Sequence, residues 1–111
     1  MPREAPLAGL LGRGASWSGE LRFDGRVRID GSFSGQVYTD DVLEVGEEGR
    51  VEGVVDAAVL IVAGVVDGKV HAKERLVVES TGQLLGEVDA ATLEVIPGAR
   101  IRAQVRVGSH A

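Results

Sequence analysis

Few residues in this chain have the side-chain chemistry and the spacing that catalysis or metal binding requires. The sequence contains two histidines, and because His110 belongs to the terminal GSHA, His71 is the main candidate. In the repeat described below, His71 shares an outward-facing column with Asp56 and Asp89, which suggests a metal or proton-transfer site. Zinc and catalytic sites need several converging ligands, however, and one imidazole supplies only one. We therefore interpret the column as an exposed ladder of charges.

A run of acidic residues is the second candidate, because carboxylates bind calcium. It consists of Asp40, Asp41, Glu44, Glu47 and Glu48. The run lacks the GGxGxD repeat of calcium-binding β-rolls, so we interpret it as solvated corners. The chain also has no P-loop, no GxGxxG element, no Ser/His/Asp set and no cysteine. We predict that the protein is not an enzyme and holds no cofactor or metal.

The elements that would position these residues form a repeat of about 17 residues. An aliphatic-x-Gly-x-Val phrase recurs, with Phe in place of the aliphatic residue in its first copy. Its glycines are Gly35, Gly53, Gly68 and Gly86, and Ala103 stands at this position in the last copy. A Leu-x-Val phrase lies between the copies and begins at Leu43, Leu60, Leu76 and Leu93. Within each phrase the period is two, which indicates short strands with one inward face.

This repeat is too long for one strand and too short for a βαβ unit, so it predicts a solenoid of stacked coils. Parallel stacking explains the abundance of valine, and glycine fits where the coil turns. The inward residues from Leu43 to Leu60 do not follow a strict six-residue cycle, which argues against left-handed hexapeptide helices, many of them acyltransferases. We predict a right-handed parallel β-helix of about five to six coils with a triangular aliphatic core and short flexible termini.

The most apolar stretch, VVDAAVLIVAGVV at residues 54–66, tests the alternative of a membrane helix. A spanning helix needs roughly 20 apolar residues, so this stretch is too short. The predicted organisation is a flexible arm over residues 1–16, a β-helix over residues 17–107 and a tail over residues 108–111. Burial of the apolar side chains of a single coil cannot offset the conformational entropy that is lost when the coil becomes ordered. The coils must therefore stack, and no capping helix is expected at the two open ends of the β-helix. Uncapped ends favour end-to-end stacking of copies.

Three segments of the chain form a recognisable pattern in front of the repeat: Leu11-Gly12, Gly19-Glu20-Leu21 and the phrase VRIDGSFSGQV at residues 27–37. With the Gly-x-Val coils that follow, this pattern resembles the bactofilin family of bacterial cytoskeletal proteins over residues 11–107. It implies a cytoplasmic scaffold that polymerises without nucleotide through the helix ends. It also implies association with other bactofilins, with cell-wall enzymes or with chromosome-segregation proteins. The alternative is a β-helix binding module that does not polymerise, or an enzyme of the hexapeptide acyltransferase type.

Three sets of residues follow as candidate contact sites. At the N-terminal end, the residues expected to polymerise are Leu21, Phe23, Val27, Ile29 and Phe33. At the C-terminal end they are Ile101, Val105 and Val107, because the phenylalanine that relatives place there is absent. An outward aliphatic set predicts lateral contact between filaments or a partner groove: Val54, Val59, Ile61, Val65 and Val77. Ordinary scatter of apolar surface residues is the alternative.

The N-terminal arm and the C-terminal arginines suggest two further contacts. Leu7, Leu10 and Leu11 predict weak membrane binding through an arm, with a plain disordered tail as the alternative. Residues 35–67 carry one basic and eight acidic groups, whereas residues 96–111 carry three arginines and no acid. If two copies meet through their C-terminal ends, these arginines repel, and salt favours assembly. Without interleaved aromatic residues, the arginines do not indicate nucleic-acid binding.

Overall fold

The computed structural model describes residues 7–108 of the 111-residue chain. Within this range the protein consists of ten β-strands, and it has no helix of the length and apolarity that a membrane span requires. The strands are β1 (Leu7–Leu11), β2 (Ser16–Phe23), β3 (Arg26–Ile29), β4 (Ser32–Thr39), β5 (Val42–Val45), β6 (Arg50–Val62), β7 (Val65–Val78), β8 (Gln83–Ala90), β9 (Leu93–Val95) and β10 (Arg100–Val107).

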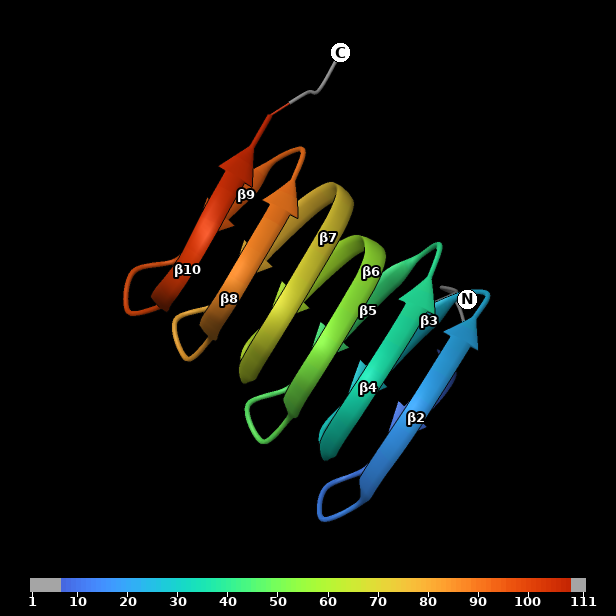
Figure 1. Ribbon diagram of the computed structural model, residues 1–111. Coiled ribbons are helices and arrows are strands. Elements are labelled where there is room, and N and C mark those ends of the chain that lie inside the picture. Colours follow the sequence, from blue (N-terminus) through green and yellow to red (C-terminus); the bar gives the residue numbers. More distant parts are fainter. Residues whose placement is uncertain (1–6, 109–111) are drawn as a thin grey trace, which may run out of the picture.

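The strands wind into a right-handed solenoid of about six coils, and every strand pair in it is parallel (Figure 1). Strands β2, β4, β6, β7, β8 and β10 lie side by side in Figure 1, so the axis runs from the blue end to the red end. The predicted all-β, right-handed parallel β-helix is therefore confirmed.

Each coil has three faces, because the chain turns at a glycine, at a short corner and at a loop. Face 1 comprises residues 16–18, 32–34, 50–52, 65–67, 83–85 and 100–102. Face 2 follows the corner glycine and comprises residues 20–23, 36–39, 54–57, 69–72, 87–90 and 104–107. Face 3 comprises residues 7–11, 26–29, 42–45, 59–62, 75–78 and 93–95.

The glycine between face 1 and face 2 is required by both conformation and space. Gly53 has φ +124°, a value that side-chain-bearing residues rarely adopt. A Cβ atom on Gly53 would lie 1.9 Å from the carbonyl oxygen of Gly35, which stacks beside it in the preceding coil. Gly68 and Gly86 repeat this arrangement with φ +135° and +107°. The glycine column therefore bends every coil except the last, where Ala103 stands in register with Gly86, and it lets consecutive backbones approach closely.

The core consists of inward side chains that stack in register from coil to coil. On face 1, Phe33, Val51, Val66 and Leu84 form one such ladder, and none of them is more than 2% exposed. This ladder is the column that the sequence repeat predicts. Thr39 is the one buried polar residue of the described range, and its hydroxyl donates a 2.5 Å hydrogen bond to the carbonyl oxygen of Gly25.

The first coil begins earlier than the sequence analysis predicts. Residues 7–11 form strand β1, which pairs with β3, so they are not part of a flexible arm. The side chain of Leu11 joins the core at 5% exposure, in register with Ile29. The repeat phrase does not mark this strand, because LAGLL contains no Gly-x-Val. Residues 1–6 of the predicted arm and 109–111 of the tail lie outside the described residues.

Candidate assembly surfaces

The last coil exposes side chains that belong to the core columns. Val105 lies in register with Val88, yet Val105 is 39% exposed and Val88 is 3% exposed. Val95 stacks on Val78 in the same way and is 45% exposed. These side chains are open because the described chain has no further coil to cover them. We define the C-terminal surface by Val95, Ile101, Ala103, Val105 and Val107.

The first coil has a corresponding opening. Trp17 lies in register with Phe33, but Trp17 is 54% exposed and Phe33 is 2% exposed. On the same strand, Leu21 and Phe23 are partly buried and pack against the core. We define the N-terminal surface by Trp17, Leu21 and Phe23. The repeat locates Trp17 in this column, because its 16-residue distance from Phe33 equals that of Gly19 from Gly35.

The residues predicted for the N-terminal end divide between this surface and the interior. Leu21 and Phe23 lie on the first coil, but Val27, Ile29 and Phe33 lie on the second and are buried. The cause is the coil formed by β1 and β2, which covers them. These three side chains therefore cannot contact another copy while the first coil is in place. The three residues predicted for the C-terminal end all lie on the last coil.

The backbone adds hydrogen-bonding groups at both ends. Strands β1 and β2 pair only with β3 and β4, and strands β9 and β10 pair only with β7 and β8. The outer edge of each end strand therefore presents a row of N–H and C=O groups within the described chain. Such an edge is a template for pairing with another chain.

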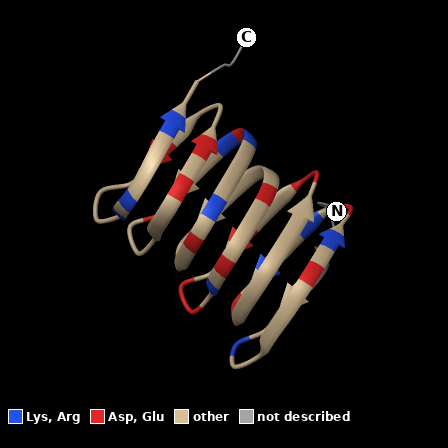
Figure 2. Ribbon diagram, in the orientation of Figure 1, with Lys and Arg blue, Asp and Glu red and all other residues tan. Residues whose placement is uncertain are grey.

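Charge is distributed unevenly along the solenoid axis (Figure 2). Residues 35–67 carry a net charge of −7, counting eight acidic and one basic side chain. The last strand carries the opposite sign through Arg100, Arg102 and Arg106, which are all exposed. The C-terminal surface is therefore apolar at its centre and basic around it.

The predicted lateral set does not form one patch. Val59, Ile61 and Val77 lie on face 3, whereas Val54 lies on face 2 and Val65 on face 1. Alternation along a strand separates inward from outward positions, but it does not say which of three faces an outward residue occupies. The five residues are all partly buried.

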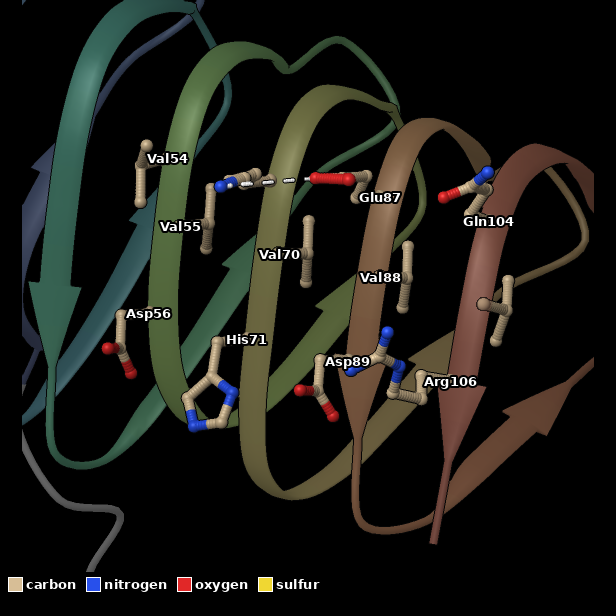
Figure 3. A pocket seen from close by; sticks show the side chains of 12 residues that line it. Val54, Val55, Asp56, Val70, His71, Glu87, Val88, Asp89, Gln104 and Arg106 are labelled. Carbon is tan, nitrogen blue, oxygen red and sulfur yellow. Dashed lines mark ion pairs between the residues drawn. The ribbon is translucent and has the colours of Figure 1, made fainter. Parts of the chain in front are cut away.

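A shallow groove on face 2 contains His71, the main candidate for chemistry. Figure 3 shows Asp56, His71 and Asp89 in a row from three consecutive coils, as the repeat predicts. In the neighbouring column, the Lys69 ammonium lies 4.0 Å from a carboxylate oxygen of Glu87. No group of three or more His, Cys, Asp or Glu residues within residues 7–108 could hold a metal ion. The arrangement is a row of one imidazole between two carboxylates on three consecutive coils.

Strand β1 contains the leucines predicted to bind membrane, and it directs Leu10 and Leu11 to opposite sides of face 3. Leu11 points into the core, whereas Leu10 is 59% exposed on the outside of face 3. The side chain of Leu7 lies outside the described residues. A membrane contact through this segment can therefore use Leu10 but not Leu11.

Comparison with known proteins points to one family. The family model for bactofilin, described as polymer-forming cytoskeletal, matches residues 9–106. A cryo-EM reconstruction of Thermus thermophilus bactofilin double helical filaments is 36% identical with a TM-score of 0.80, covering 89% of this chain and 98% of that one. A crystal structure of a point mutant of Thermus thermophilus bactofilin is 34% identical with a TM-score of 0.71, covering 81% and 99%. No curated protein matches the chain.

Proposed function

Because the chain belongs to the bactofilin family of polymer-forming cytoskeletal proteins, we propose that it polymerises end to end through the N-terminal and C-terminal surfaces. Stacking the end of one solenoid on the end of another covers the open core columns. It also pairs the free edges of the terminal strands. Assembly through these surfaces needs no nucleotide, because the contact consists of apolar side chains and backbone groups.

The location of the exposed apolar side chains carries this proposal. Four of the five most exposed large hydrophobic residues of the described chain lie in the inward columns of the first or the last coil: Trp17, Val95, Val105 and Val107. The fifth, Leu10, points outward on face 3 of the first coil and does not count toward the ends. The four coils between them bury their inward side chains. In a monomer, these ends leave apolar surface in water, which is unfavourable. Another copy of the chain is the partner whose core columns have the same shape and spacing.

The energetics indicate that side chains and strand edges act together. Full burial of a valine contributes about 1.5–3 kcal/mol, so three half-exposed valines contribute only about 1 kcal/mol each. Association costs on the order of 4–15 kcal/mol in lost translational and rotational freedom. Backbone hydrogen bonds along β9 and β10, each of about 1 kcal/mol, supply the remainder.

Two arginine substitutions on the same strand test the C-terminal surface. Val105→Arg places a charge in the desolvated contact, whereas Gln104→Arg adds the same charge at the neighbouring outward position. We expect Val105→Arg to lower the sedimentable fraction about tenfold or more and Gln104→Arg to leave filaments intact. Phe23→Arg is the equivalent change at the N-terminal surface. Undiminished filaments of both Val105→Arg and Phe23→Arg in electron micrographs would contradict end stacking.

We further propose that two filaments of this protein associate side by side. The Thermus thermophilus relative, 36% identical, forms double helical filaments. A filament made by end stacking displays each of the three faces continuously along its length. One face is then available for a second filament and the others for partners.

The proposed cellular role is that of a cytoplasmic scaffold. A filament presents the same surface at every subunit, so it can position cell-wall enzymes or chromosome-segregation proteins, or incorporate other bactofilins. Along a single filament, whose face 3 is open, many weak membrane contacts through Leu10 add up in the same way. Co-purification of partners with wild-type protein but not with Val105→Arg tests whether recruitment depends on the filament.

A further inference from the structure

Face 3 carries the one continuous group of outward aliphatic side chains in the described solenoid. We call this group the aliphatic strip: Val42, Val59, Ile61 and Val77. Val42 lies in register with Val59, and Ile61 lies in register with Val77. The strip therefore extends over three consecutive coils. Because each strip residue alternates with a buried core residue, its side chain points outward and partly into solvent.

Outward aliphatic residues on the other faces are isolated by polar neighbours. On face 1, Val65 lies between Arg50 and Gln83. On face 2, Val54 lies between Gln36 and Lys69. These positions have no aliphatic neighbour in register, so they are single apolar residues of the kind common on any protein surface.

Ion pairs border the aliphatic strip at both ends. On the N-terminal side Arg26 pairs with Glu44, and Arg28 pairs with Asp30 at 2.8 Å and with Glu44 at 3.8 Å. The hydrogen bond and the charge of Asp30 raise the pKa of the Arg28 guanidinium, which stays positive. On the C-terminal side, one further pair completes the border.

That C-terminal pair joins Arg75 and Glu94. These ion pairs together contain three basic and three acidic groups and carry no net charge, although the whole chain carries −5. Because the charges that border the strip are balanced in this way, two copies of an acidic protein can bring these apolar-centred faces together with little net repulsion. A second copy of this chain fits the chemistry of face 3 for this reason.

We infer that face 3 is the surface through which two filaments of this protein pair, with the aliphatic strip of each filament packed against the same face of the other. The inference rests on the proposed end-to-end assembly, because it specifies how the resulting filaments associate. It assigns lateral contact to Val42, Val59, Ile61 and Val77. It removes Val54 and Val65 from that contact.

The size of face 3 indicates that pairing depends on polymerisation. Its strands span roughly 13 Å at 3.3 Å per residue, and about six coils span roughly 29 Å at 4.8 Å per coil, which gives about 400 Å². A stable interface buries about 800 Å² on each partner. One pair of subunits therefore binds weakly, whereas many subunits in one filament engage together and gain avidity.

Substitutions to lysine on different faces test the inference. Ile61→Lys places a charge in the strip, while Val65→Lys and Val54→Lys make the same kind of change at partly buried valines on faces 1 and 2. In electron micrographs at one protein concentration, we expect wild type, Val65→Lys and Val54→Lys to form paired filaments. We expect Ile61→Lys to form single filaments, with the paired fraction lowered at least tenfold. Val77→Lys serves as a second strip variant if Ile61→Lys impairs folding, as judged by circular dichroism.

The outcomes separate this inference from the proposed function. Absence of any wild-type filament would refute end-to-end assembly itself. Filaments that form but stay single in wild type would overturn the assignment of face 3, as would pairing that survives in both Ile61→Lys and Val77→Lys. Loss of pairing in Val65→Lys or Val54→Lys to the same extent would also overturn it. Absence of lateral dimers in sedimentation of the monomeric Val105→Arg protein would support the dependence of face 3 pairing on polymerisation.

Discussion

Substitution of the corner glycine Gly53 by alanine isolates the contribution of close coil stacking to stability. Gly53 and Gly19 have the same φ of +124°, so alanine suffers the same backbone strain at both. They differ in their surroundings: a Cβ on Gly53 would lie 1.9 Å from the carbonyl oxygen of Gly35, whereas a Cβ on Gly19 would have no atom within 4 Å. Gly19→Ala is therefore a matched control.

The magnitudes follow from this geometry. A φ of +124° lies outside the left-handed helical region and costs alanine about 2 kcal/mol, which is the whole expected effect at Gly19. At Gly53, a carbon–oxygen contact requires about 3.3 Å, so the neighbouring carbonyl must move by roughly 1.4 Å. That shift disrupts two or three ladder hydrogen bonds between β4 and β6, each worth about 1 kcal/mol. We expect a total loss of about 4–5 kcal/mol for Gly53→Ala, a large fraction of the 5–15 kcal/mol that stabilises a typical domain.

Urea denaturation followed by far-UV circular dichroism measures both effects. Both substitutions are made in the Val105→Arg background, because polymerisation makes apparent stability depend on concentration. With an m-value of about 2 kcal/mol per M, the midpoint falls by about 1 M for Gly19→Ala and by about 2 M for Gly53→Ala. Equal urea midpoints for the two variants would refute the argument that position 53 requires glycine because of the close Gly35 backbone as well as because of φ.

Three other predictions concern assembly, core packing and membrane contact. If copies meet through their C-terminal ends, the sedimentable fraction should rise between about 0.05 and 0.5 M salt, because screening weakens repulsion among the arginines of β10; steady loss of polymer with salt would contradict this. Phe33→Ala should lower the free energy of unfolding by about 3–5 kcal/mol in urea denaturation, because Phe33 is fully buried below the first coil; a loss below about 1 kcal/mol would contradict its packing. Leu10→Asp should reduce co-sedimentation with anionic liposomes relative to Gln104→Asp, and equal binding would exclude a contact through Leu10.

Most of the fold could be predicted from the sequence because the repeat fixes the register. The glycine positions Gly35, Gly53, Gly68 and Gly86 stack as the alignment of phrases implies. The inward aliphatic columns follow the two-residue period. Strand β1 was missed because its residues, LAGLL, carry no copy of the phrase and pair through backbone groups that any sequence supplies.

The assembly surfaces were only partly predictable, because exposure depends on where the stack ends. Val27 and Ile29 have the same inward pattern as Leu21, and only the additional coil distinguishes buried residues from terminal ones. Val95 was missed for the same reason, since it continues the buried column of Val62 and Val78. The repeat predicts which side chains point inward, but their burial is set by neighbouring coils.

The end surfaces of the described solenoid are cross-sections of its core, so the proposed end-to-end stacking uses the same columns of side chains that fold each coil. Val88 and Val105 occupy the same column, and their exposures differ because only Val88 has a coil on each side. A polar substitution at Val88 should therefore unfold the protein, whereas the same change at Val105 should spare folding and prevent stacking. Under the proposed end-to-end stacking, folding and polymerisation depend on one side-chain pattern, and the position of a residue along the axis decides which of the two a substitution disrupts.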